Sequence, residues 1–166
     1  MAINIVCGPA GSGKSTWVRR NMSEGDLIVD MDALGMAITG KDLQGYIFET
    51  PKSILDVLMP LKTYLINQAI VFHNDGYCRD VWITISGADF LERKRLAEKA
   101  GETPCNVIVL EISHNDCRAH IKSDPSRGNW QQWDPIIKRW WDRYIPRKGD
   151  IVIKLAELDE EIERRR

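Results

Sequence analysis

Residues 8–15 combine the residue types and the spacing that bind phosphate groups. They read Gly-Pro-Ala-Gly-Ser-Gly-Lys-Ser and match G-x-x-x-x-G-K-[ST] at every position. Glycines let the backbone approach a ligand closely, so the N–H groups of such a loop can point at phosphate oxygens. Lys14 would reach the β- and γ-phosphates, and the Ser15 hydroxyl would bind magnesium. The segment therefore predicts a site for a nucleoside triphosphate with Mg²⁺. The predicted nucleotide-binding residues in and after this loop are Gly8, Gly11, Ser12, Gly13, Lys14, Ser15 and Thr16.

The flanking sequence supplies the strand and the helix that this loop requires. Residues 3–7 form a short apolar run typical of a buried strand, and residues 16–22 are expected to form a helix. The N-terminus of that helix would add its partial positive charge to the phosphate site. An accidental Gly-rich turn is a poor alternative, because both the pattern and its context match.

Two carboxylates follow the next predicted strand, which we place at residues 27–32. In an open α/β sheet the carboxyl ends of the strands face the ligand crevice, so Asp30 and Asp32 are expected beside the phosphate loop. We interpret Asp32 as the general base that accepts the proton of an acceptor hydroxyl, because Asp30 should still lie within the strand. Asp30 would instead help to place water around magnesium. The alternative for either residue is a cap on the helix that begins near Ala33.

Basic residues surround a short loop at residues 123–128 that contains a proline and a glycine. Such a loop between two helices could close over the site as a lid, and an arginine on it would stabilise charge on the transferred phosphoryl group. We assign this catalytic role to Arg127 and expect Arg118 to contact the nucleotide; simple solvent exposure is the alternative for each. From Arg127 to Lys148, six basic residues stand against two acidic ones, which would suit either a phosphate backbone or an exposed helix face.

Strands alternate with helices along the chain, which predicts an α/β fold: a P-loop NTPase with a parallel sheet of about five strands and helices on both faces. The predicted strands are residues 3–7, 27–32, 81–85, 106–111 and 151–155. The predicted helices are residues 16–22, 33–38, 61–74, 90–100, 115–122 and 129–144. We expect one P-loop kinase-like domain over residues 1–166, with a helical lid at about 114–130 and a charged helix or tail at about 156–166.

Three further segments carry different signals. Pro51 and Pro60 should interrupt regular structure, and residues 43–48 could be helix or loop. In the predicted helix over residues 129–144, apolar side chains recur three and four residues apart, which favours a helix packed on the domain over a surface that stacks bases. These side chains are Trp130, Trp133, Ile137, Trp140 and Tyr144.

The composition is that of a globular protein, with 43% hydrophobic and 28% charged residues among 166. The net charge of −1 provides no overall attraction to nucleic acid or to a membrane, so any polyanion site must be local. The four cysteines have no C-x-x-C spacing and suit buried thiols in a reducing compartment. We find no leader and no stretch long enough to span a bilayer, and therefore expect a cytoplasmic protein with no membrane partner.

Together these motifs resemble the kinase domain of bacteriophage polynucleotide 5′-hydroxyl kinase and its small phage-encoded relatives. The similarity covers residues 8–17, the Asp-Met-Asp of residues 30–32, the Phe-Leu-Glu-Arg-Lys-Arg-Leu of residues 90–96 and the pair Arg127-Gly128. It implies ATP and Mg²⁺ as ligands, nucleic-acid 5′ ends as the acceptor, and general-base catalysis by the residue that matches at Asp32. It also implies a lid arginine at Arg127, and the host cytoplasm as the location of a phage-encoded protein.

The sequence departs from that family at two positions that bear on the acceptor. The family has an arginine that contacts the substrate phosphate, and in this chain Gly35 stands near that position. The family also has an acidic residue after its third strand, where this chain has Ser86 or Gly87. We predict phosphoryl transfer from ATP to an acceptor hydroxyl, with a 5′-hydroxyl end of DNA or RNA as the first candidate. The alternatives are a nucleotide or small-molecule kinase, an NTP-hydrolysing accessory protein of phage DNA processing or packaging, and a nucleotide-binding regulator. The predicted catalytic residues are Lys14, Asp32 and Arg127, and the predicted metal-binding residues are Ser15 and Asp30.

Overall fold

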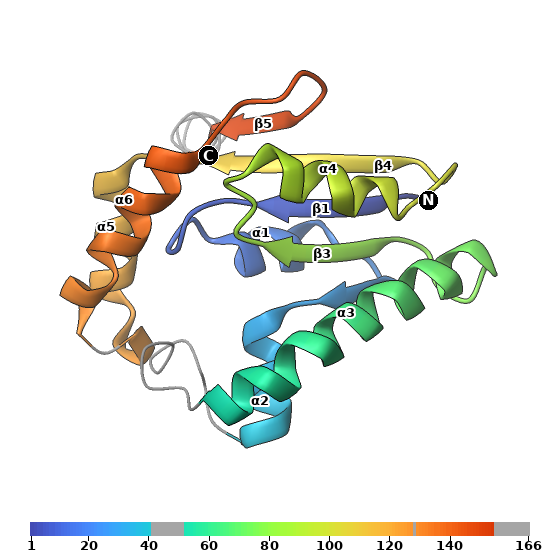
Figure 1. The fold of residues 1–166 in the computed structure, drawn as a ribbon, viewed down its shortest axis with the longest axis horizontal. Helices are drawn as coiled ribbons and strands as arrows, with labels where there is room; N and C mark the ends of the chain where they lie inside the picture. The colour runs from blue at the N-terminus through green and yellow to red at the C-terminus, as the bar shows by residue number, and fades with distance from the viewer. Residues whose placement is uncertain (41–51, 128, 155–166) are drawn as a thin grey trace, which may run out of the picture.

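A five-stranded parallel sheet forms the centre of the protein. The computed structural model describes residues 1–40, 52–127 and 129–154, and the strand order within them is β2-β3-β1-β4-β5. The strands are β1 (Ile3–Cys7), β2 (Leu27–Val29), β3 (Val81–Ile85), β4 (Cys105–Glu111) and β5 (Ile151–Lys154). β1 pairs residue for residue with β3 on one side and β4 on the other. The predicted α/β fold is confirmed, and the three central strands run in one direction toward the same edge of the sheet (Figure 1).

Helices cover both faces of this sheet (Figure 1). α3 (Lys52–Asn74) and α4 (Phe90–Glu98) pack on the face that carries Ile5, whereas α1 (Lys14–Asn21) packs Val18 against Val6 on the other face. Successive side chains of a strand point to opposite faces, so these two neighbouring residues belong to different cores. α2 (Met31–Thr39) follows β2, and α5 (His114–Ser123) and α6 (Asp134–Arg143) lie together beyond the carboxyl ends of the strands.

β2 is shorter than predicted, because the residue after it caps a helix. The strand ends at Val29 rather than at residue 32. Asp30 takes the N-cap position of α2, where its Oδ1 accepts hydrogen bonds from the backbone N–H groups of Asp32 and Ala33 at 3.0 and 3.1 Å. These bonds satisfy donors that a helix start otherwise leaves unpaired, so α2 begins at Met31 directly after the strand.

α3 is longer than predicted, because it begins at Lys52 and continues through Pro60. Pro60 cannot donate a hydrogen bond to the preceding turn, but the helix buries Leu58 before it and Ile66 after it, and this packing outweighs the loss. Contrary to expectation, α3 is the one helix among the described residues that could cross a membrane by length and composition alone, with a mean hydropathy of 1.3. Its Ile66 and Ile70 nevertheless lie in the core beside the sheet.

The predicted long aromatic helix divides into a 3₁₀ turn, η3 (Trp130–Gln132), and α6. Pro135 lies in the first turn of α6, where its missing N–H costs no hydrogen bond, so a helix can start there. The aromatic stripe packs inward as predicted, with Trp133, Ile137 and Trp140 each at most 4% exposed. Two predicted segments, residues 43–48 and 156–166, fall outside the described residues.

A buried arginine fixes the loop that follows β3. Arg93 of α4 donates to the carbonyl oxygens of Gly87 and Ala88 in that loop, at 2.5 and 3.0 Å. The same guanidinium donates to the carbonyl oxygen of Ile145 and forms an ion pair with Asp150 (2.9 Å), whose side chain is only 1% exposed. Because a buried charge is costly without such partners, this network holds the loop after β3 against the segment that joins α6 to β5.

Candidate functional site

A large cavity lies at the carboxyl ends of β1 and β3, beside the glycine-rich loop. Its volume is about 1170 Å³, which exceeds the roughly 300–1,000 Å³ typical of a site for one small ligand. A smaller hollow elsewhere, near Tyr77, contains one carboxylate, Asp26, whose oxygens already accept hydrogen bonds from the protein. The larger cavity is therefore the candidate site. The predicted site residues that line it are Gly8, Gly11, Ser12, Gly13, Lys14, Ser15, Thr16, Asp30, Asp32 and Arg127.

The loop between β1 and α1 has the backbone shape that phosphate binding requires. Gly11 and Gly13 adopt φ values of 79° and 78°, which residues with a side chain rarely adopt. Gly13 precedes α1 without a side-chain cap, so the first N–H groups of the helix can be offered to an anion. The Ser12 hydroxyl is buried and has no hydrogen-bond partner in the described part of the chain. Such an orphaned hydroxyl beside uncapped N–H groups fits a ligand rich in phosphate oxygens.

Lys14 lies across the same loop. Its Nζ donates to the carbonyl oxygens of Gly8 and Pro9, both at 2.9 Å. Loss of water around the ammonium group lowers the pKa of Lys14 to about 8, and the positive charge of Arg127 contributes to the shift. The negative charge of Asp32 opposes it. Lys14 is thus held by weak acceptors, the loop carbonyls, which a phosphate could replace with a full negative charge.

Ser15, Asp30 and Thr84 form a hydrogen-bonded group beside Lys14. The hydroxyls of Ser15 and Thr84 each donate to Asp30 Oδ2 at 2.8 Å. Burial alone would raise the pKa of Asp30, but the backbone N–H bond from Ala33 and these two hydroxyls hold it below its ordinary value. Because the Ser15 proton is donated to Asp30, the lone pairs of Ser15 Oγ are available to a cation.

This donor set fits magnesium better than a metal that needs a dedicated protein cage. The described residues contain no cluster of three or more His, Cys, Asp or Glu side chains that could hold a metal ion. Mg²⁺ commonly takes only one or two protein oxygens and completes its coordination with water and substrate phosphates. The Ser15 hydroxyl, with Asp30 hydrogen-bonded behind it, has the oxygen chemistry for such a site.

The two neighbouring acidic residues have different surroundings. Asp30 is 6% exposed and caps α2, which was the alternative interpretation, so the prediction that it lies within the strand is wrong. Asp32 lies in the first turn of α2, half-buried in the wall of the cavity. The carboxylate of Asp30 accepts hydrogen bonds from four donors and is buried. Asp32 is only half-buried and is therefore the more exposed of the two acids in the cavity wall.

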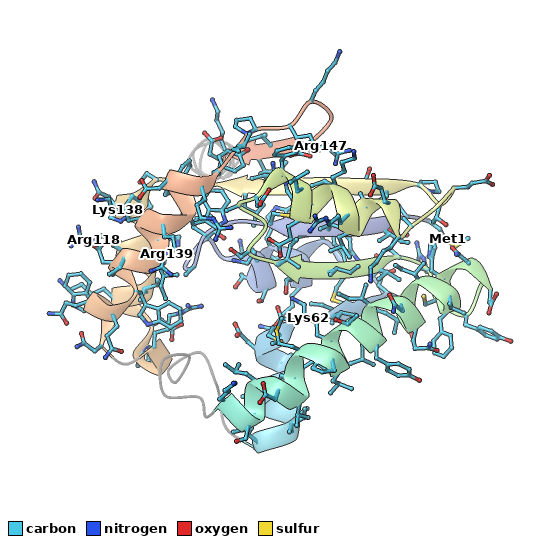
Figure 2. All side chains as sticks on the ribbon, viewed as in Figure 1. Met1, Lys62, Arg118, Lys138, Arg139 and Arg147 are labelled. Carbon is cyan, nitrogen blue, oxygen red and sulfur yellow. The ribbon has the colours of Figure 1, made fainter. Side chains whose placement is uncertain are left out.

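The two predicted lid arginines lie in different places. Arg127 belongs to the 3₁₀ turn η2 (Pro125–Arg127) and lines the cavity; its Nε donates to Asp124 Oδ2 at 3.1 Å, and its guanidinium lies over the ring of Trp133. Arg118 does not line the cavity. It forms an ion pair with Asp134 (3.0 Å) and lies over the ring of Trp130, at the outer side of α5 (Figure 2). The predicted catalytic role of Arg127 therefore has geometric support, whereas the predicted nucleotide contact of Arg118 has none.

The helix that carries Arg118 touches the glycine-rich loop directly. A Cβ atom on Gly11 would lie 2.6 Å from the carbonyl oxygen of Cys117 and 2.9 Å from a side-chain carbon of Ile121. His120 lies next to Ile121 on the same helix, and its ring nitrogen Nδ1 lies 3.0 Å from the carbonyl oxygen of Gly11. Gly11 is therefore required twice, for its backbone angle and for the close approach of α5.

Several charged residues of the cavity were not predicted as site residues. Lys62 comes from α3, Glu92 from α4, and Arg139 and Arg143 from α6. Glu92 brings a carboxylate close to the loop after β3, where an acidic residue had been expected and is missing. Arg139 and Arg143 belong to the basic segment of residues 127–148 that the sequence indicates. Nothing in the local spacing marks Lys62 or Glu92, because they join the cavity only when the helices pack. In total the cavity is lined by seven basic residues (Lys14, Arg19, Arg20, Lys62, Arg127, Arg139 and Arg143) and four acidic ones (Asp30, Asp32, Glu92 and Asp124).

Known proteins resemble this chain in their structures, whereas the sequence searches found no match. No protein-family model matches the chain, and no curated protein matches its sequence. A gluconokinase from Sinorhizobium meliloti 1021 superposes with a TM-score of 0.58 and 14% identity, covering 99% of this chain and 97% of that one. The tunicamycin resistance protein of Deinococcus radiodurans gives a TM-score of 0.54 with 15% identity, covering 99% and 94%. A chain of the Pnkp1/Rnl/Hen1 RNA repair complex gives 0.57 with 14% identity over 89% of this chain and 49% of that one. At such low identity the likeness establishes the fold alone: this chain has the α/β fold of P-loop NTPases.

Proposed function

We propose that the protein is a kinase that uses ATP and Mg²⁺ to phosphorylate an acceptor hydroxyl. The observation that carries this proposal is that Lys14, Ser15, Asp32 and Arg127 line one cavity, which is larger than one small ligand needs. A cation for the phosphates, a magnesium ligand, an accessible acid and a lid arginine are the parts that phosphoryl transfer uses. The kinase fold of the structural neighbours supports the same reaction class.

The residues of the site would share the reaction as follows. Lys14 and the loop N–H groups hold the β- and γ-phosphates, and Arg127 balances the charge on the moving phosphoryl group. Asp32 accepts the proton of the acceptor hydroxyl, the hydroxyl oxygen forms a new bond to the γ-phosphorus, and the bond to the β-phosphate oxygen breaks to leave ADP. When bound, Mg²⁺ would neutralise charge on the phosphates from a site at Ser15, with Asp30 holding the serine in place.

The acceptor we propose first is the 5′-hydroxyl end of DNA or RNA. Basic residues outnumber acidic ones in the cavity, and Arg139 and Arg143 continue this positive charge along α6. The resemblance to phage 5′-hydroxyl kinases and the structural likeness to a chain of an RNA repair complex point the same way. Phosphorylation of a small molecule is the second candidate, because the likeness to a gluconokinase covers nearly the whole of both chains. A cytoplasmic location, where ATP is supplied, belongs to this proposal; the free thiols of all four cysteines suit it.

The test is to incubate the protein with γ-labelled ATP, Mg²⁺ and a panel of 5′-hydroxyl oligonucleotides, nucleosides, nucleotides and sugars, and to follow the label. Asp32→Asn should reduce transfer by roughly 10²–10⁴-fold, because it removes the proton acceptor, while ATP affinity changes little. Asp142→Asn is the matched control, since Asp142 is an exposed acid on α6 that does not line the cavity.

Two results would contradict the proposal. Label that appears only as inorganic phosphate, whatever the acceptor, would identify a nucleoside triphosphatase, the accessory-protein alternative. An Asp32→Asn protein that transfers phosphate as fast as the Asp142→Asn protein would show that Asp32 is not the base.

A further inference from the structure

Lys62 is a charged residue for which the fold itself gives no explanation. It lies on α3, which follows Asp32 in the chain, whereas the glycine-rich loop precedes Asp32. Lys62 and that loop nevertheless line the same cavity. Figure 2 shows it between α3 and the end of the sheet. Its Nζ makes one hydrogen bond, to the carbonyl oxygen of Thr84 at 3.3 Å. An ammonium group carries three donors, so two of them are left without a partner in the described part of the chain.

The charges around Lys62 are close enough to act on it but do not pair with it. Burial lowers the pKa of Lys62, and the carboxylates of Glu92, Asp30 and Asp32 oppose that shift. None of these carboxylates forms an ion pair with Lys62 among the described residues. A half-buried ammonium group without an ion-pair partner costs stability, and this cost is recovered when a negatively charged ligand binds.

The position of Lys62 assigns it to the acceptor rather than to the nucleotide. Lys14 lies on the glycine-rich loop, where its Nζ donates to the carbonyl oxygens of Gly8 and Pro9. Lys62 enters the same cavity from α3, and its Nζ donates to the carbonyl oxygen of Thr84, whose hydroxyl donates to Asp30. The two ammonium groups thus enter the cavity from different elements, and the negative charge of Asp32 acts on both. If Lys14 holds the triphosphate and Asp32 receives the proton of the acceptor, Lys62 faces the remainder of the acceptor molecule.

We propose that Lys62 binds an anionic group on the acceptor, so that the acceptor is an alcohol that carries a phosphate or a carboxylate close to its reacting hydroxyl. This inference rests on the kinase function proposed above, and it deepens that proposal by naming a specificity-determining residue. Met59, one turn earlier on α3, lines the cavity beside Lys62 and is exposed. It would contact the apolar part of the same ligand, because residues three apart share a helix face.

The experiment compares binding of paired ligands that differ in one negative charge. Adenosine 3′-monophosphate is compared with adenosine, and glucuronate with glucose, in each case with the nucleotide site filled by saturating Mg²⁺ and ADP. Equilibrium binding is measured by calorimetry and by tryptophan fluorescence, so no phosphoryl transfer is needed for the readout. The variants are Lys62→Gln, whose amide can still donate to the Thr84 carbonyl, and Lys62→Arg, which keeps the charge. Lys52→Gln is the control, because Lys52 is an exposed lysine on the same helix that does not line the cavity.

The wild-type protein should bind the anionic member of one pair more tightly than its neutral partner. Lys62→Gln should weaken that anionic ligand by roughly tenfold or more and the neutral one by less than about twofold. Lys62→Arg should keep much of the preference, Lys52→Gln should leave it unchanged, and the pair that responds identifies phosphate or carboxylate as the recognised group. If Lys62 had a purely structural role, Lys62→Gln would reduce the affinity for both ligands of a pair equally and would also lower the thermal unfolding midpoint.

Three results would overturn the inference: no preference for either anionic ligand in the wild-type protein, an equal loss of both members in Lys62→Gln, or no loss at all. Should Lys62→Gln fail to fold, the wild-type preference and its retention in Lys62→Arg decide the question. Failure of the proposed function is a separate observation. If no acceptor is labelled from γ-labelled ATP, the kinase reaction is refuted, whereas a Lys62-dependent preference in the binding experiment still supports the anion site.

Discussion

The two sides of the cavity are built in different ways. The phosphate side comes from consecutive residues, since Lys14 and Ser15 follow directly on the loop whose N–H groups they complement. The opposite side is assembled from separate helices, with Lys62 on α3, Glu92 on α4 and Arg139 on α6. Under the proposed function, binding of the triphosphate is therefore encoded locally and largely by the backbone. Recognition of the proposed acceptor depends instead on how the helices pack.

The helical group formed by α5, η2, η3 and α6 joins these two sides. It touches the glycine-rich loop through the contacts between Gly11 and α5, and it brings Arg127 into the cavity from η2. It also carries Arg139 and Arg143 along its inner edge. Substitutions at Arg127 and at Gly11 therefore test most directly how the two sides of the cavity depend on each other.

The largest effect is expected at Arg127. Arg127→Gln should reduce phosphoryl transfer by roughly a thousandfold, because a cation over the transferred group stabilises its charge in the transition state. Arg118→Gln should have an effect of less than about twofold, since Arg118 pairs with Asp134 outside the cavity. Rates with saturating ATP and acceptor, measured from γ-labelled product, compare the two variants directly.

This pair of variants removes the same charge from neighbouring parts of one helical group. Equal losses in both would mean that only the overall charge of the lid matters, and the separation of Arg127 from Arg118 would then have no functional meaning. A loss of phosphoryl transfer in Arg118→Gln alone would mean that Arg118, and not Arg127, is the catalytic arginine.

The central part of the fold could be predicted from the sequence because its signals are local. Residues 3–7 and 81–85 are runs in which all residues but one are apolar, and they form β1 and β3 with those bounds. The predicted helix over residues 90–100 follows directly on Asp89, a residue type that favours the N-cap, and the Asp89 side chain accepts a hydrogen bond from the N–H of Leu91 at the start of α4. The backbone of the glycine-rich loop could likewise be predicted, since its pattern specifies glycines where positive φ angles are found, at Gly11 and Gly13.

Where tertiary contacts decide the outcome, the sequence was insufficient. The run Leu-Ile-Val-Asp-Met-Asp continues a strand pattern through residue 32, but Asp30 instead binds Ser15 and Thr84 and caps α2. Pro60 looked like an end of regular structure, yet packing on both sides of it keeps α3 continuous. Lys62 has no local feature that separates it from the other lysines, because its cavity exists only when α3 lies against the sheet.

A smaller effect is expected from Gly11→Ala, which tests the contact between the glycine-rich loop and α5. Both Gly11 and Gly13 have positive φ angles, so alanine at either position costs about 1–2 kcal/mol in backbone strain. At Gly11 the new Cβ would also meet the carbonyl oxygen of Cys117 at 2.6 Å, whereas at Gly13 nothing lies within 4 Å. Gly11→Ala should therefore reduce the free energy of unfolding by about 1–3 kcal/mol more than Gly13→Ala.

Thermal and denaturant unfolding of the two alanine variants without nucleotide give this difference. Similar stabilities would indicate that α5 can withdraw from the loop at little cost, and the loop and the lid would then be independent of each other. A larger loss in Gly13→Ala would contradict the contact geometry altogether.

The smallest effect concerns the pH dependence of ATP binding, and it connects Arg127 to the phosphate side. Because the pKa of Lys14 in the ligand-free protein is lowered to about 8 by desolvation and by Arg127, the free site loses its positive charge as the pH rises above that value. Bound phosphate stabilises the protonated form, so binding takes up a proton and becomes weaker with rising pH. The affinity for ATP with Mg²⁺ should fall by up to about tenfold per pH unit above 8 and should be insensitive to this group well below 8.

Variants at three positions determine whether this slope comes from Lys14. Lys14→Arg should abolish the decline up to pH 9.5, because an arginine stays charged throughout this range. Arg127→Gln removes a neighbouring positive charge and should move the onset of the decline to higher pH, whereas Arg118→Gln should not. Calorimetric titrations between pH 7 and 9.5 give the slope, and an affinity that stays constant over this range would show that Lys14 remains fully charged in the free site. In that case Arg127 would act on the transferred phosphoryl group and not on the protonation of Lys14. The bound substrates alone would then connect Arg127 with the phosphate side of the cavity.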